Sequence, residues 1–167
     1  FRIGFETIPL ITKSKDPRFG KLLRNLELLI IDEISMVRAP MLDAISQSLQ
    51  VHRNNSEPFG GVKILACGDL FQLPPVVQSH EENTIYSKYD SVYFFDALSF
   101  KDIKNPVFFE LTKSFRQEED DIFYELLNNI RLGIDLDVTV NRINQQCYDP
   151  TVEVEPFMTV TSSQNRA

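Results

Sequence analysis

The sequence predicts an α/β fold in which helices and a parallel sheet form three layers. Two apolar runs, at residues 28–31 and 62–66, have the length of buried strands, and an acid follows each run within three residues. Apolar residues at helical spacing lie between and after these runs. Strands that alternate with helical segments typically form parallel sheets, so this order of elements favours a three-layer α/β architecture.

The first strand delivers Asp32 and Glu33 at its end. Parallel sheets of doubly wound folds bind ligands at the carboxyl ends of their strands. In nucleotide hydrolases an acid at this position helps to hold Mg²⁺, and a neighbouring acid can orient the attacking water. The pair is therefore typical of a Walker B element. The same pattern also occurs where a strand exits into a solvated turn, and this segment alone leaves both interpretations open.

A helix is expected next. Pro40 suits a first helical position, and apolar residues mark one face as far as about Val51. Residues 52–61 are expected to form a loop before the second strand.

The second strand ends in a stiff loop. Gly68 permits a tight exit, and Pro74 and Pro75 restrict the chain beyond it, so that the amide of Gln72 can be aimed at a ligand. Such an amide can sense the terminal phosphate of ATP. A tight turn with an exposed glutamine is the alternative, and the length of the pattern disfavours it.

Several further elements are expected after a polar stretch at 78–91. They are a short aromatic run at 93–96, a third strand at 106–111, a helix at 118–132 closed by Gly133, a helix at 136–147 and a last strand at 157–161. The acids at 118–121 suit the first turn of a helix, where the macrodipole favours them, better than a metal site.

Three segments together resemble a known family. They are DEISM at 32–36, GDLFQLPPV at 68–76 and FRQ at 115–117, and they resemble motifs II, III and IV of superfamily 1 DNA helicases of the Pif/RecD type. PFGG at 58–61 and LLNNIRLG at 126–133 extend the similarity. The resemblance implies a RecA-like P-loop NTPase fold, here incomplete. Residues 1–114 would belong to the first motor domain, and residues 115–167 would hold the hinge, motif IV and the start of the second.

The resemblance also implies roles for four residues. Asp32 would bind Mg²⁺ and Glu33 would orient the attacking water. Gln72 would sense the terminal phosphate of ATP, and Arg116 would stabilise its charge. For Arg116 a salt bridge to the acids that follow it is the alternative. These helicases also carry a GxxxxGK[ST] phosphate loop. The printed sequence has none, because its one Gly-Lys pair, Gly20-Lys21, is followed by leucine.

The expected function is therefore that of a central piece of an ATP-dependent DNA helicase. The whole protein would couple Mg-ATP hydrolysis to movement on single-stranded DNA and to unwinding of forked duplexes, with 5′-to-3′ polarity as the family expectation and repair or recombination proteins as partners. The isolated piece is expected to hydrolyse ATP poorly. The alternatives are a RecD-like motor subunit of an ATP-dependent exodeoxyribonuclease and a non-catalytic module that binds nucleic acid or protein.

Net charge argues against a broad DNA-binding surface. The chain has 17 basic and 24 acidic residues, a balance of −7, whereas phosphate contacts usually require basic surfaces. A narrow groove with stacking platforms remains compatible with this balance. Residues 1–10 mix aromatic and basic side chains, as such a contact would, or they are simply a hydrophobic segment of the fold.

The remaining composition indicates an ordinary globular segment. With 167 residues the chain can bury one core or slightly more. Cys67 and Cys147 lack disulfide or metal spacing and are expected to be small buried residues, while His52 and His80 are expected at the surface. We expect no membrane span and no signal peptide, hence an intracellular protein, cytoplasmic if bacterial, and not a secreted one.

Overall fold

The computed structural model describes residues 8–9, 11–112 and 121–147. The chain divides into two compact units, Phe1–Glu110 and Leu111–Ala167. The domain boundary expected after residue 114 falls among residues outside the described ranges, so the assignment of the two parts to motor domains stays a prediction.

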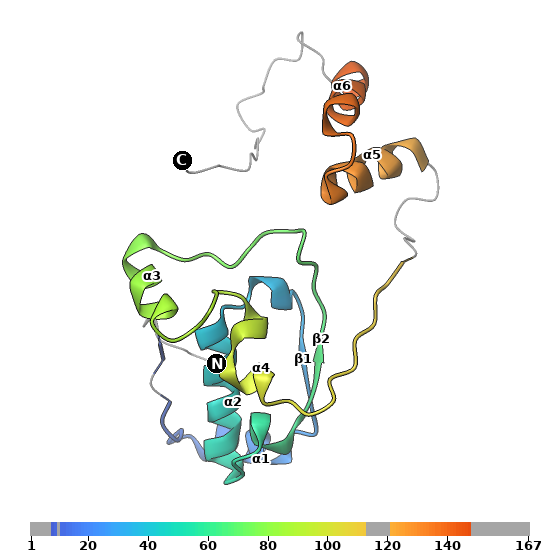
Figure 1. Cartoon of the computed structure of the whole chain (residues 1–167). Helices are drawn as coiled ribbons and strands as arrows, with labels where there is room; N and C mark the ends of the chain where they lie inside the picture. Colours follow the sequence, from blue (N-terminus) through green and yellow to red (C-terminus); the bar gives the residue numbers. More distant parts are fainter. Residues whose placement is uncertain (1–7, 10, 113–120, 148–167) are drawn as a thin grey trace, which may run out of the picture. The chain divides into compact units, whose positions relative to one another are not determined.

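The first unit contains most of the regular structure (Figure 1). Its elements are α1 (Pro17–Asn25), β1 (Leu28–Ile31), the 3-10 turn η1 (Ile34–Met36), α2 (Ala39–Arg53), η2 (Pro58–Gly61), β2 (Lys63–Ala66), α3 (Ser79–Tyr86), η3 (Phe94–Asp96) and α4 (Leu98–Lys101). The two strands and α2 follow the expected pattern. Helices α1 and α3 were not expected, although Asp16 before Pro17 is a typical helix start.

The sheet consists of β1 and β2, which run parallel. Leu28 pairs with Lys63 and Ile31 with Ala66, so both strands end at the same edge. One face packs against the core through Leu29, Ile31 and Ile64, and Figure 1 shows α2 beside the strands. The other face exposes three apolar side chains, Leu28, Ile30 and Leu65. The parallel sheet is confirmed, and within the described ranges helices cover only one of its faces.

The strand expected at 106–111 does not form in the described structure. This segment has no regular secondary structure and no strand partner there, and Val107, Phe108 and Phe109 are 75%, 75% and 89% exposed. The expectation is wrong for these residues because an apolar run predicts burial, whereas a strand also needs a neighbouring strand edge to pair with.

The PFGG segment forms a tight turn on α2 rather than an open loop. Phe59 is buried, and its backbone N–H donates to Ser46 Oγ at 2.9 Å. Gly60 has φ of 60°, and a Cβ there would lie 2.9 Å from the carbonyl carbon of Leu49. Only glycine tolerates both this conformation and this approach, which explains why the turn closes over the helix so tightly.

Arg53 joins three segments at the end of α2. Its Nε donates to Gly60 O at 2.8 Å, and its Nη1 lies 2.8–2.9 Å from the carbonyl oxygens of Leu23, Arg24 and Leu26. These last carbonyls belong to the C-terminal end of α1, where the helix itself offers no partners. One guanidinium therefore satisfies the end of α1 and fixes it to α2 and η2.

Asp43 performs a similar task in the middle of α2. Its carboxylate accepts from the backbone N–H groups of Ser99 at 2.8 Å and Leu98 at 3.3 Å, and from Tyr89 Oη at 2.9 Å. Burial, together with this carboxylate, raises the pKa of Tyr89, so the phenol keeps its proton and remains a donor. Three of the hydrogen bonds that hold the segment from Tyr89 to α4 on α2 thus end at a single carboxylate.

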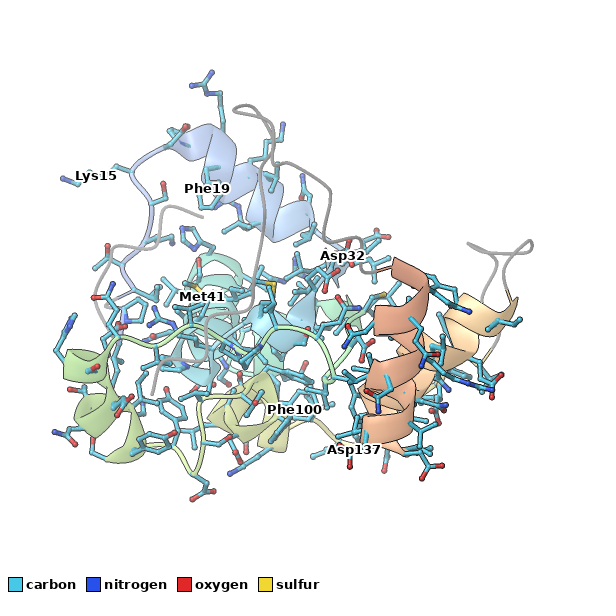
Figure 2. The ribbon with its side chains drawn as sticks, turned by 90° about the horizontal axis from the view of Figure 1, so that it is seen from above. Lys15, Phe19, Asp32, Met41, Phe100 and Asp137 are labelled. Atoms are coloured by element: carbon cyan, nitrogen blue, oxygen red, sulfur yellow. The ribbon has the colours of Figure 1, made fainter. Side chains whose placement is uncertain are left out.

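Two surface and burial predictions are wrong. His52 is buried: its Nε2 accepts from Ser14 N at 2.8 Å, and its Nδ1 donates to Ser48 O at 2.7 Å. Its ring and that of Phe19, labelled in Figure 2, are nearly perpendicular, with centroids 5.7 Å apart. Cys67, expected to be buried, is exposed because β2 ends just before it. His80 is exposed, as expected.

The second unit contains α5 (Asp121–Leu132) and α6 (Leu136–Cys147), both close to their expected ranges. Gly133 has φ of 69° and follows the end of α5, as predicted, while Leu126 and Thr139 are buried. The first residues of the expected helix at 118–132 and the strand expected at 157–161 lie outside the described ranges. None of the described helices is long and apolar enough to cross a membrane.

We expect Arg53→Met to lower the free energy of unfolding by about 2–4 kcal/mol, because several carbonyls lose a charged donor. Urea unfolding of the chain measures this change. Lys21→Met, on the exposed side of α1, is the matched control and should change stability little. An equal loss in both variants would show that Arg53 is not the joint between α1, α2 and η2.

Candidate functional site

The ends of the two strands are joined by backbone hydrogen bonds. Cys67 N donates to Ile31 O at 2.9 Å, and Ile34 N donates to Cys67 O at 2.9 Å. These bonds lie just beyond the strands themselves. The turn after β1 and the exit from β2 therefore form one edge, as expected for a parallel sheet that binds a ligand at its carboxyl end.

Asp32 and Glu33 form a strained turn at this edge. Glu33 has φ of 51° and ψ of 44°, and its N–H donates to Asp32 Oδ1 at 3.0 Å. A residue with a side chain adopts this left-handed conformation at a cost of roughly 1–2 kcal/mol. Both residues are exposed, and Asp32 is labelled in Figure 2. The turn thus presents two carboxylates to solvent beyond a partly buried strand.

Gly68 is needed for close approach. A Cβ at this position would lie 2.9 Å from Ile34 Cγ2 and 3.0 Å from Ser35 N. The tight exit expected from the sequence is therefore present, but its cause is the neighbouring turn and not a left-handed glycine. Ser35 beside it is buried, and within the described ranges its hydroxyl has no hydrogen-bond partner.

Asp69 holds Gln72 in place. Its Oδ1 accepts from Phe71 N at 3.0 Å and its Oδ2 accepts from Gln72 Nε2 at 3.3 Å, while Gln72 N donates to Asp69 O at 3.1 Å. No role was predicted for Asp69 from the sequence. The sequence does hold a signal: an aspartate after a glycine at the end of a strand often accepts from the backbone N–H two residues later, as in an Asx turn.

The structure brings three of the four predicted site residues to one edge. Asp32 and Glu33 lie in the turn after β1, and Gln72 lies in the loop after β2. Among the described residues neither acid hydrogen-bonds Gln72, so the backbone bonds between the strand ends connect them. Arg116 lies outside the described residues.

The carboxylates at this edge could bind Mg²⁺ only if a nucleotide supplied further oxygen ligands. In the part of the chain that the structure describes, no group of three or more His, Cys, Asp or Glu residues could hold a metal ion by itself. Mg²⁺ commonly takes one or two carboxylates and completes its shell with water and phosphate oxygens. The exposed carboxylate of Asp32 fits that arrangement.

Comparisons with known proteins agree with this geometry. The model of the PIF1-like helicase family matches residues 2–141. The ATP-dependent DNA helicase RRM3 of Saccharomyces cerevisiae is 40% identical over 91 residues, which make up 53% of this chain and 13% of the relative. The chain thus spans a small part of that protein.

Solved structures show the same likeness. Pif1 helicase from Bacteroides, in complex with ADP-AlF3 and ssDNA, superposes with a TM-score of 0.77 and 38% identity, covering 89% of this chain and 34% of the other. A structure of two coordinating Pif1 helicases at forked dsDNA gives a TM-score of 0.75 and 41% identity over 81% of this chain and 32% of the other.

We expect Gly68→Ala to destabilise the chain by about 1–3 kcal/mol, because the new methyl group would press on Ile34 and on the backbone of Ser35, directly after the acidic turn formed by Asp32 and Glu33. Thermal unfolding measures the change. Gly20→Ala is the matched control: there a Cβ would meet only the flexible side chain of Arg24, at 3.3 Å, and helix propensity should favour alanine by up to about 1 kcal/mol. Equal stability of wild type and Gly68→Ala would contradict the close packing of the two strand ends.

Proposed function

Because this chain belongs to the PIF1-like helicase family, with the RecA-like α/β fold of its structural neighbours, we propose that the protein containing it is an ATP-dependent DNA helicase. The observation that supports this most is the edge where backbone hydrogen bonds join the two strand ends. There the acidic turn of Asp32 and Glu33 meets the loop that carries Gln72, which runs from residue 67 to residue 78 and is called the Gln72 loop below. A single site there can bind Mg-ATP and respond to its hydrolysis. The chain covers about a third of the solved relative's length, so the proposal concerns the whole protein.

In this proposal each residue of the edge has a separate task. Asp32 holds Mg²⁺ directly or through water, and Glu33 accepts a hydrogen bond from the attacking water and so orients it. The metal, when bound with ATP, neutralises charge on the phosphate oxygens. Asp69 keeps the amide of Gln72 at the edge, where it can contact the terminal phosphate. Arg116 would add a bidentate cation to the same phosphate.

We propose single-stranded and forked duplex DNA as the substrates. Two of the structural neighbours are Pif1 helicases, one in complex with ssDNA and one unwinding at forked dsDNA. In this chain the exposed side chains of Leu70, Phe71 and Leu73 lie on the Gln72 loop and offer apolar surface for bases. The 5′-to-3′ polarity, partners in repair or recombination, and an intracellular location, cytoplasmic in a bacterium, follow from the same family expectation.

We expect Glu33→Gln to reduce ATP turnover of the full-length protein by at least about a hundredfold while ATP still binds, because the attacking water loses its oriented acceptor. Gln72→Ala should lose most of the stimulation of ATP turnover by single-stranded DNA. Both are measured by steady-state ATPase assays with and without DNA. Glu27→Gln, an exposed acid at the opposite end of β1, is the matched control and should leave both rates unchanged.

Absence of DNA-stimulated turnover in the full-length wild type would overturn the helicase proposal and favour a non-catalytic binding module. The 167-residue chain alone should hydrolyse ATP poorly, because it contains no GxxxxGK[ST] loop. Rapid Mg²⁺-dependent turnover by this chain, lost in Glu33→Gln, would show that other residues replace that loop.

A further inference from the structure

An ion pair connects α3 to the start of α2. Arg38 Nη1 lies 2.9 Å from Glu81 Oε1, and the two side chains are 21% and 8% exposed. The two residues are 43 positions apart in the sequence. A carboxylate as buried as that of Glu81 depends strongly on its partner, because an uncompensated buried charge is costly.

Glu81 in turn fixes the far end of the Gln72 loop. Its Oε2 accepts from Gln78 N at 3.1 Å, and its own N–H donates to Gln78 O at 2.8 Å. Gln78 is the residue at which the loop ends and α3 begins. Pro75 is buried and Val77 packs against the core, whereas Leu73 and Val76 are exposed. The loop is therefore anchored at its end and largely solvated before it.

Arg38 belongs to the segment that follows the acidic turn. It lies two residues after η1, its carbonyl accepts from Leu42 N at 3.1 Å, and the next residue, Ala39, donates to Val92 O at 2.9 Å. The near end of the loop is bound to the same segment through Ile34 N and Cys67 O. Both ends of the Gln72 loop are thus attached to residues 34–38.

We propose that Arg38 is a positioning residue that acts through Glu81 and Gln78 to keep the Gln72 loop in register with the acidic turn. The effect of Arg38 on ATP turnover rests on the proposed function, whereas its ion pair with Glu81 and the hydrogen bond from Gln78 to Glu81 are present in the structure whatever the function. A shift in the turn that holds Asp32 and Glu33 would move both ends of the loop together. Without the ion pair the far end would lose its charged link to residues 34–38, and the loop would transmit the nucleotide state to DNA less well.

Hydrogen exchange tests the tether directly. Arg38→Met keeps much of the aliphatic stem and removes the charge, and Arg38→Lys keeps the charge. In the full-length protein, the hydrogen-bonded amides of Phe71, Gln72 and Gln78 should exchange about tenfold faster in the methionine variant and stay near wild type in the lysine variant. Lys101→Met is the control, since it removes the ion pairs to Asp90 and Asp96, which lie outside the loop. Equal acceleration across α2 and the loop would overturn the proposal, because the pair would then be a general stabiliser.

Steady-state ATPase assays then test the coupling. In Arg38→Met the stimulation by single-stranded DNA should fall at least about fivefold, with the KM for ATP unchanged and with most of the stimulation retained in Arg38→Lys. Unchanged stimulation in the methionine variant would overturn the positioning role. A wild type without any stimulation would defeat the helicase proposal instead, and the exchange experiment would still decide whether Arg38 tethers the loop.

Discussion

The rest of the candidate site depends on the backbone bonds that join the strand ends. Parallel pairing in register brings Ile31 and Ala66 to one level, and Cys67 then bonds to both sides of the turn after β1. Any side chain at residue 68 would separate these segments, so the pairing and the glycine require each other. The positions of the two acids and of Gln72 all follow from this one junction.

Polar side chains attach the short helices that the small hydrophobic core does not fix by itself. Arg53 fixes α1, Asp43 fixes α4, and Arg38 fixes α3, each by charged hydrogen bonds from a residue on α2 or directly before it. A two-stranded sheet buries little by itself. Long-range polar contacts with one central helix therefore hold these short elements in place while leaving the loop between β2 and α3 largely solvated.

Sequence reasoning succeeded where local chemistry decides the structure. An apolar run followed by acids identified β1, Pro40 and periodic leucines identified α2, and Gly133 marked the end of α5. It failed where distant residues decide. The burial of His52 depends on Ser14 and Phe19, and the segment around Phe108 lacks a neighbouring edge among the described residues. The link between Arg38 and Glu81 leaves no local pattern at all. The Gln72 loop is an intermediate case. Asp69 is a local signal for a turn, but the sequence does not show that its carboxylate also holds the Gln72 amide.

The left-handed conformation of Glu33 implies that the stability of the fold and the catalytic role of the carboxylate favour different residues at this position. Glycine would occupy the left-handed region there without strain, and asparagine with little, yet neither would supply a carboxylate. Under the proposed role, a population selected for thermal resistance alone would lose this glutamate, and one selected for turnover would keep it. The acidic turn is thus a place where evolution toward heat tolerance and evolution toward speed would diverge.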